Sequence, residues 1–361
     1  MTGTNAQNVT TYYISEKVSQ VRWLPELQQQ SDRFVTGSWD IAKNYVRLWR
    51  LQQNPYVNQN VPIVPCCHDK VSMEDDVTGM EFVDKNTLAV GCGDGHLSVL
   101  KVQRAVEKDQ IQRKARSELL HYFKSANTSR SASCTGVATF GTDIATVGDD
   151  GRLNVVNADN LQQVKRTIEA DSVSLFAVVY ANHQEIFTAN GMGVVRMFDA
   201  RASNEAQPNI AFVVGCQDEK NFNGVSCMTT HPMQKHILLC GSEEGSISVY
   251  DLRNLRYPAS YLGAHNSRIT DIAFHPKDPT KLFTAAESGE VWLWSEQKSL
   301  INASEEQEDY CAWLCGERVS DLVKVKGVLS NVCKPINSID VHGMRLVCGS
   351  DAEIVFLADN V

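Results

Sequence analysis

The segment LAVGCGDGHLSVLKV, from Leu88 to Val102, joins a short apolar run to an alternating run through a Gly-Asp-Gly turn. This arrangement is typical of a β-hairpin, because glycine and aspartate favour a tight turn and alternation favours a half-buried strand. It recurs in four later segments, which read IATVGDDGRLNVVNAD, IFTANGMGVVRMFDAR, LLCGSEEGSISVYDLR and LFTAAESGEVWLWSE. The glycines that follow the five turns, spaced by 56, 42, 52 and 44 residues, are Gly95, Gly151, Gly193, Gly245 and Gly289. A repeat of roughly 40 to 45 residues predicts one blade of a β-propeller, so two steps fit directly and two carry insertions.

The segment VTGSWDIAKNYVRLW, from Val35 to Trp49, contains a Trp-Asp dipeptide at Trp39 and Asp40. Trp-Asp ends a strand in many propeller repeats. When this segment is aligned with the other hairpins, however, the dipeptide falls on the turn and the next four residues lengthen the loop. We therefore predict that Trp49 holds the strand position of the repeat's tryptophan. Trp39, Asp40 and Asn44 become candidate protein-binding residues in a turn, with Trp39 at least partly exposed.

The apolar runs predict an all-β chain with seven blades in a single domain that spans residues 1–361. The predicted blades begin near Trp23, Thr78, Cys134, Ser172, Val225, Ala264 and Ile336. The seventh has no outer strand of its own, and the β-rich segment at residues 10–18 is expected to supply that strand and close the ring. Closure hides sheet edges that would otherwise pair with other chains. Two separate β domains are the alternative, but no Gly/Ser/Pro-rich linker divides the blades.

Charge and composition exclude several classes of protein. The net charge of −9, from 34 basic and 43 acidic residues, argues against direct nucleic-acid binding, which requires cations that neutralise phosphates. No apolar run approaches the roughly 18 to 20 residues that a membrane helix needs, so no membrane insertion is expected. The 11 cysteines are scattered and odd in number, and the polar N-terminal residues do not resemble a signal peptide. Reduced thiols in the cytosol or nucleus are the expectation.

Two motifs resemble sites of chemistry but lack the required context. The glycine-rich run from Gly91 to Gly95 resembles a phosphate-binding loop, yet it leads into an alternating strand and not into a helix N-terminus. Cys66, Cys67 and His68 lack the second spaced ligand pair that zinc sites usually have. No nucleophile, base and orienting group recur at catalytic spacing, so we expect no enzyme activity, no cofactor, no metal and no small-molecule substrate.

His265 is predicted to be a structural histidine. It follows an alanine where propeller repeats place Gly-His before the first strand of a blade. Thr284 and Trp294 are its expected hydrogen-bond partners. Ser288 stands where the repeat usually has a turn aspartate, so the network is expected to be incomplete.

The first insertion, at about residues 101–133, is basic. From Lys101 to Arg130 it holds eight basic and three acidic side chains, a local net charge of +5. RKARSELLHYF is compatible with an amphipathic helix or with an outer strand between loops, and the need for a fourth strand favours the latter, with SANTSRSAS as a flexible loop. Arg113, Lys114 and Arg116 are expected to be exposed, and they form either a solvated surface or a docking site for an acidic partner face.

The second insertion, at about residues 297–334, contains the acidic run EEQED at residues 305–309 and then CAWLCG. Trp313 in this segment is a further candidate for protein binding. We predict that it packs as part of an outer strand, and an exposed binding anchor is the alternative.

Four stretches together resemble one family of repeat proteins. TGSWD with its lengthened turn, CTGV with ATVGDDGRLNV, the AH…FHP…LFT pattern and the LVCGSDAE ending are similar to the WD40-repeat nucleoporins of forty-three kilodaltons. The resemblance runs from about Val18 to near the C-terminus, and the two insertions align poorly. It implies a non-enzymatic structural subunit of the Y-shaped scaffold, the outer ring of the nuclear pore complex. The chain would then dock on the short-arm α-solenoid nucleoporin near the Seh-type propeller.

That resemblance also implies a location at the nuclear envelope and roles in pore assembly, mRNA export and protein import, with attachment to the kinetochore in mitosis. A second hypothesis comes from the Asp-x-Arg pairs Asp199/Arg201 and Asp251/Arg253. They resemble the Trp-Asp-x-Arg box of substrate receptors for cullin-RING ubiquitin ligases, with phenylalanine or tyrosine in place of tryptophan. Local salt bridges at strand ends are the simpler explanation of the two arginines.

Overall fold

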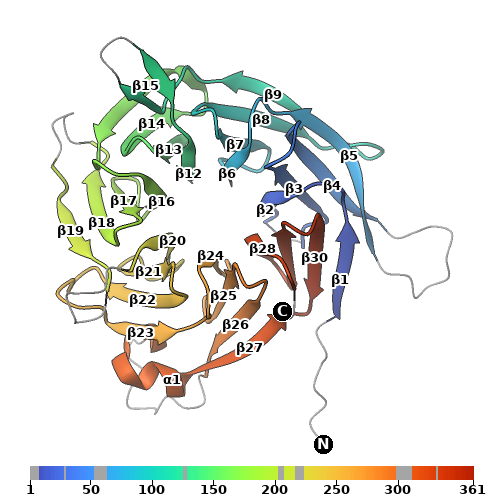
Figure 1. Ribbon diagram of the computed structural model, residues 1–361. Helices are drawn as coiled ribbons and strands as arrows, with labels where there is room; N and C mark the ends of the chain where they lie inside the picture. The colour runs from blue at the N-terminus through green and yellow to red at the C-terminus, as the bar shows by residue number, and fades with distance from the viewer. Residues whose placement is uncertain are drawn as a thin grey trace, which may run out of the picture.

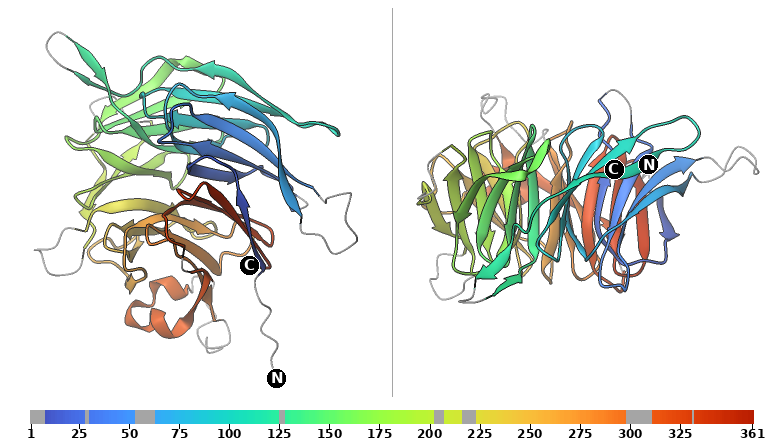
Figure 2. Two further views of the ribbon diagram at one scale, coloured as in Figure 1. Left: turned by 45° about the vertical axis from the view of Figure 1, so that its right-hand side comes forward. Right: turned by 90° about the horizontal axis from the view of Figure 1, so that it is seen from above.

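The chain forms a ring of seven antiparallel four-stranded sheets around a common central axis (Figures 1 and 2). The computed structural model describes residues 8–27, 30–52, 63–124, 128–201, 207–215, 223–297, 311–330 and 332–361. Each blade places its four strands in order from the ring's axis outward, as Figure 1 shows. The predicted all-β, seven-bladed propeller is confirmed.

The two inner positions of every blade are occupied by consecutive strands. The innermost strands, which line the channel, are β2 (Val18–Trp23), β6 (Val77–Phe82), β12 (Cys134–Phe140), β16 (Leu175–Tyr180), β20 (Val225–Thr230), β24 (Ile269–Phe274) and β28 (Ile336–His342). The second strands are β3 (Arg33–Ser38), β7 (Thr87–Cys92), β13 (Asp143–Gly148), β17 (Glu185–Asn190), β21 (Ile237–Ser242), β25 (Lys281–Ala286) and β29 (Arg345–Ser350).

The third and outermost positions complete the blades. The third strands are β4 (Tyr45–Gln52), β8 (Leu97–Gln103), β14 (Arg152–Asn157), β18 (Val194–Asp199), β22 (Ser246–Asp251), β26 (Val291–Glu296) and β30 (Ile354–Asp359). The outermost strands are β5 (Val64–Ser72), β9 (Gln110–Arg116), β15 (Asn160–Glu169), β19 (Ile210–Val213), β23 (Ser260–Gly263), β27 (Val323–Leu329) and β1 (Asn8–Tyr13).

The ring has two faces. We call the upper face the side on which second strands turn into third strands, as at residues 149–151. We call the lower face the side on which innermost strands turn into second strands, as at residues 141–142. Phe140 ends β12, and Gly141, with a φ of 58°, begins that lower turn.

The glycines that revealed the repeat are required by the backbone. All five have positive φ, between 73° and 87°, which only glycine adopts without strain. At Gly151 an added Cβ would also lie 2.2 Å from the carbonyl oxygen of Asp171, which belongs to the chain entering the next blade. The turn glycines therefore fix both the hairpin and the approach of the neighbouring blade.

A feature that the sequence did not reveal recurs in every blade. The pairing between the innermost and second strands shifts register one residue after it begins, for example between Val18 and Gln20 and between Ile336 and Ser338. Such a bulge increases local twist. Its repetition at the same place in seven blades gives the inner strands a common curvature around the channel.

The N-terminal strand closes the ring as predicted, although its limits differ. β1 pairs antiparallel with β30 from Asn8↔Asp359 to Tyr13↔Ile354. The predicted strand ran over residues 10–18, but Ser15 has a φ of 61° and Val18 already begins the first blade. The chain therefore turns between β1 and β2. A cluster in which Trp23 and Trp49 pack against Val347 seals the seventh blade to the first.

The two insertions each supply the outermost strand of a blade. In the first insertion, β9 is the predicted outer strand, and it takes the place of the alternative amphipathic helix. The predicted loop at residues 125–133 contains a short strand, β11 (Ser129–Ser131), which pairs with β10 (Tyr122–Lys124). In the second, β27 is the outer strand. It is preceded by η2 (Ala312–Leu314), η3 (Gly316–Arg318) and α1 (Val319–Leu322). The acidic run at residues 305–309 lies outside the described residues.

Buried histidines hold three consecutive turns of the lower face. His231 and His275 follow their innermost strands, and His342 ends its own. The Nδ1 atom of His231 accepts hydrogen bonds from the backbone N–H groups of Met233 (3.3 Å) and Gln234 (2.9 Å). His275 does the same for the two corresponding N–H groups of its turn. Each imidazole must be neutral at Nδ1 to accept, so these turns depend on deprotonated histidine.

Acid is expected to destabilise the fold through His231. Burial lowers the pKa of His231 to about 4, whereas the unfolded chain takes up this proton near the ordinary pKa of 6.5. The stabilisation is therefore complete above pH 6.5 and is lost as the pH falls toward 4, by up to about 3 kcal/mol. In thermal melts at pH 7 and pH 4.5, the His231→Gln variant should lose less stability than the wild type.

The control for this measurement is His183→Gln, at an exposed histidine. This control should show the wild-type difference between the two pH values. An unchanged pH dependence in His231→Gln would rule out His231 as an acid-sensitive group.

Candidate interaction surfaces

The central channel contains two cavities that meet at its waist. The upper cavity, of about 440 Å³, is lined by the first residues of the innermost strands, and the lower cavity, of about 550 Å³, by their last residues. Arg22 and Asp271 line both, so they lie where the cavities meet. Among the described residues, no group of three histidine, cysteine or acidic side chains is placed to hold a metal ion.

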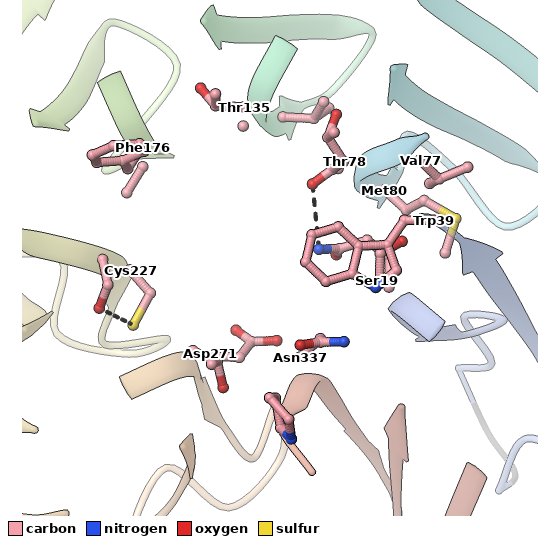
Figure 3. A pocket seen from close by; sticks show the side chains of 18 of the residues that line it. Ser19, Trp39, Val77, Thr78, Met80, Thr135, Phe176, Cys227, Asp271 and Asn337 are labelled. Atoms are coloured by element: carbon pink, nitrogen blue, oxygen red, sulfur yellow. Dashed lines mark hydrogen bonds between the residues drawn. The ribbon is translucent and has the colours of Figure 1, made fainter. Parts of the chain in front are cut away.

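Trp39 lies at the mouth of the upper cavity. Its indole Nε1–H donates to Asp351 Oδ1 at 2.8 Å, across the junction between the first and seventh blades. The side chain is half-buried, so it is partly exposed as the sequence predicted. Figure 3 shows Trp39 and Phe176 on opposite sides of this cavity. The repeat's strand tryptophan is Trp49, as predicted: it lies in β4 and its Nε1–H donates to Thr36 Oγ1 at 2.9 Å.

The other two residues of this turn differ in exposure. Asp40 is exposed, has a φ of 50° and forms an ion pair with Lys17. Asn44 is only 5% exposed, and its amide is held by Ser38 and by Asp76, which accepts from Nδ2 at 2.9 Å. The Asn44 side chain therefore shapes the lengthened turn, and contact between Asn44 and a partner stays a prediction.

The basic side chains of β9 are paired within the molecule. Arg113 donates to Glu74 at 2.5 and 2.8 Å, and Arg116 donates to Asp94 at 2.5 Å. Lys114 pairs with Asp159 at 2.9 Å. The expectation that all three are exposed is wrong for the two arginines, whose side chains are 25% and 33% exposed.

These acidic partners come from neighbouring loops and blades that sequence spacing does not bring near β9. The formal charge of the first insertion is therefore largely balanced by the ring itself. Lys114 is the residue of this trio that remains exposed. Docking of this strand on an acidic partner stays a prediction.

The arginines of the Asp-x-Arg pairs form local ion pairs at the ends of β18 and β22. Arg253 pairs with Asp251 at 2.9 Å, and Arg201 Nε lies 3.7 Å from Asp199. Their side chains are still more than half exposed on the lower face. Local salt bridges therefore explain both Asp-x-Arg pairs without a binding partner.

Trp313 is fully buried, so its exposure as a binding anchor is excluded. It lies in η2 and contacts Phe274 edge-to-face with ring centroids 6.0 Å apart. The prediction that Trp313 packs inside the protein is confirmed, but the prediction that it belongs to an outer strand is wrong, because it lies in η2. Trp313 fastens the helical part of the second insertion to the hydrophobic cluster between the fifth and sixth blades.

The predicted histidine network exists in the sixth blade, and a fuller one exists in the third. His265 Nε2 and Trp294 Nε1 both contact Thr284 Oγ1, at 2.8 and 3.0 Å. His265 Nδ1 has no hydrogen-bond partner, and Glu290 Oε2 lies 3.5 Å away, so Ser288 does leave the network incomplete.

In the third blade, His121 joins Thr146 to Asp150, with both distances 2.9 Å. Sequence reasoning missed His121 because the insertion places it 29 residues before Asp150. His121 can be recognised as the histidine of the third blade only once β9 is known to be the outermost strand of the second blade.

The repeated hairpins, the turn glycines and the threonine–histidine–tryptophan bonds define a β-propeller of the WD40 class. A family model described as "WD domain, G-beta repeat" matches residues 257–295. The chain is also similar to Nucleoporin Nup43 of Homo sapiens and of Mus musculus, with 27% identity to each over 97% of this chain and 98% of each relative. The nuclear pore complex protein nup43 of Dictyostelium discoideum is 26% identical over 43% of this chain and 36% of its own length. These similarities support a WD40 nucleoporin of the Nup43 type.

No helix among the described residues has both the length and the apolar character that a bilayer crossing requires.

Proposed function

We propose that this chain is a non-enzymatic structural subunit of the nuclear pore complex at the nuclear envelope, within the Y-shaped scaffold. The observation that carries the proposal is the similarity to Nucleoporin Nup43 over 97% of the chain and 98% of the relative, which is nearly the full length of both. A closed ring with a rigid, repeated core suits a subunit whose task is to present surfaces to other proteins. The same proposal includes roles in pore assembly, mRNA export and protein import, and attachment to the kinetochore in mitosis.

The partner proposed is the short-arm α-solenoid nucleoporin, near the Seh-type propeller. Because β1 of the chain itself fills the outer position of the seventh blade, the ring needs no strand from the partner. Docking then uses loops and faces. Trp39 and Asp40 on the upper face are the proposed contacts, since a partly exposed tryptophan beside a charged turn matches the composition of interface hot spots.

Affinity purification of the tagged chain from interphase nuclei tests this proposal. Pore scaffold proteins should be recovered with the wild type, and Trp39→Ala should weaken binding to the reconstituted short arm by roughly tenfold or more, since an anchor tryptophan typically contributes about 2 kcal/mol or more. Tyr257→Ala, at an exposed aromatic residue far along the chain, is the matched control and should bind normally. Equal melting temperatures are required of both variants. Recovery of no scaffold protein with the wild type would refute the assignment.

The same experiment addresses the alternative, a substrate receptor of a cullin-RING ubiquitin ligase. Arg201 and Arg253 remain accessible beside their own aspartates. The double variant Arg201→Ala/Arg253→Ala should therefore keep normal recovery of pore proteins. Recovery of a ligase adaptor with the wild type and its loss from the double variant would favour the alternative.

A further inference from the structure

The lower mouth of the channel is ringed by exposed apolar side chains. Leu27, Phe140, Met233 and Met344 lie on four of the seven turns around it and are 69%, 41%, 74% and 56% exposed. We call these four residues the turn ring. Phe140 itself lines the lower cavity, and the other three lie one or two residues beyond lining residues. Several large apolar side chains around one opening are typical of a surface that binds another protein, and methionine adapts readily to a partner's shape.

The turns that carry this ring are held in place by contacts between blades. His275 Nε2 donates to the carbonyl oxygen of Gly343 at 2.6 Å, and Lys277 Nζ donates to the carbonyl oxygen of Leu27 at 3.0 Å. His342 Nδ1 accepts from the backbone N–H of Ser31 at 3.1 Å. Three consecutive turns, of the sixth, seventh and first blades, are thereby joined. A surface that is already ordered loses little conformational entropy when a partner binds.

The floor of the lower cavity carries more negative than positive charge. Among its lining residues Arg22 is the only lysine or arginine, and the carboxylates are Glu81, Asp271 and Asp340. Arg22 Nε lies 3.1 Å from Glu81, and its Nη1 lies 3.9 Å from Asp271.

Burial raises the pKa of Asp340 to about 7 in spite of the opposing effect of Arg22, so Asp340 is only partly ionised at neutral pH. A cation bound beside it would favour the charged form of this carboxyl. The one lining histidine, His342, adds no compensating charge, because burial lowers its pKa.

We propose that the lower cavity binds a lysine or arginine side chain of a partner protein, whose neighbouring apolar residues pack on the turn ring. The added cation would contact Glu81 and Asp340 and balance the excess of carboxylates over guanidinium groups in the cavity lining. Its aliphatic stem would lie against the aromatic wall, which includes Trp23, Tyr180 and Phe274. A purely apolar segment would cover the carboxylates without pairing them, and an acidic one would add to the repulsion. This site is distinct from Trp39 on the upper face and does not depend on the assignment to the nuclear pore.

Methyl NMR on the full chain, with labelled methionines, tests the site directly. The probes are two acetylated peptide amides, Leu-Ala-Arg-Ala-Leu and the same peptide with glutamine in place of arginine. The arginine peptide should shift the methyl signals of Met233 and Met344 at the mouth and of Met228, which lines the cavity. Met192, exposed on the upper face, is the internal control and should not move. The glutamine peptide should bind at least tenfold more weakly.

Variants separate charge recognition from the fold. Glu81→Gln and Asp340→Asn should each weaken binding of the arginine peptide several-fold, whereas Glu244→Gln, at an exposed upper-face carboxylate, should not. If either variant fails to fold, the comparison of the two peptides on the wild type still decides the question. Equal affinity for both peptides, shifts confined to Met192, or no shift at millimolar peptide would each overturn the proposal.

Discussion

Removal of residues 1–13 should lower the melting temperature by roughly 5 to 10 °C and cause aggregation on warming. β1 contributes partly buried side chains such as Val9 and Tyr12 to two hydrophobic clusters and six residue pairs with β30. Loss of this burial and these hydrogen bonds costs about 3 to 5 kcal/mol. Aggregation follows because β30 would become an open sheet edge, which pairs readily with other chains. Calorimetry and light scattering measure the two effects.

Two controls make this result specific to strand pairing. Thr11→Ala changes an exposed side chain of the same strand and should leave the melting temperature within about 1 °C of the wild type. A synthetic peptide of residues 8–17, added to the truncated chain, should restore part of the lost stability. A truncated chain that melts like the wild type would show that the ring does not need β1.

Asp150→Ala should destabilise the fold by about 3 to 5 kcal/mol, because it leaves buried partners without a counterpart. The Asp150 side chain is 2% exposed and accepts from His121 Nδ1 and from the backbone N–H of Tyr122, both at 2.9 Å. Burial opposes ionisation, but the hydrogen bond and charge of His121 and the backbone N–H groups hold the pKa of Asp150 below its ordinary value. Chemical denaturation measures this free energy of unfolding.

The sixth blade offers the reverse experiment. Ser288 occupies the position that Asp150 holds in the third blade, and His265 Nδ1 lacks a hydrogen-bond partner there. Ser288→Asp should therefore stabilise the chain by about 1 kcal/mol, the usual net contribution of one hydrogen bond. If Asp150→Ala proves neutral, or if Ser288→Asp destabilises, the histidine networks do not hold the blades together as described.

The fold was predictable because its signals are local. A hairpin turn needs glycine at positive φ, so Gly95, Gly151 and their counterparts marked five blades without any knowledge of long-range contacts. The closing strand was predictable because a seventh blade with three strands leaves an unpaired edge. Its limits were wrong because β-propensity continues through residues 14–18, whereas the turn at Ser15 depends on where the chain must enter the first blade.

The candidate sites were harder to predict because they depend on which blades become neighbours. From the sequence alone, Arg113 is expected to be an exposed cation. In the fold it forms a salt bridge with Glu74, which lies in the loop after the first blade. The sequence places Asn44 in an open loop and does not show that its Nδ2–H donates to Asp76 in the folded chain. The turn ring and the three carboxylates around Arg22 come from six different blades, so no spacing within the sequence connects them.

The pairing of β1 with β30 also determines the order in which the molecule can be completed. The hydrogen bond from Thr10 to Leu357 spans 347 positions of the chain, so β1 stays unpaired until β30 has been synthesised. During translation the earlier blades can fold on their neighbours, since each contacts the next one along the chain. The ring itself remains an open arc until β30 leaves the ribosome. A nascent chain therefore protects β1 only after the strands of all seven blades have been synthesised.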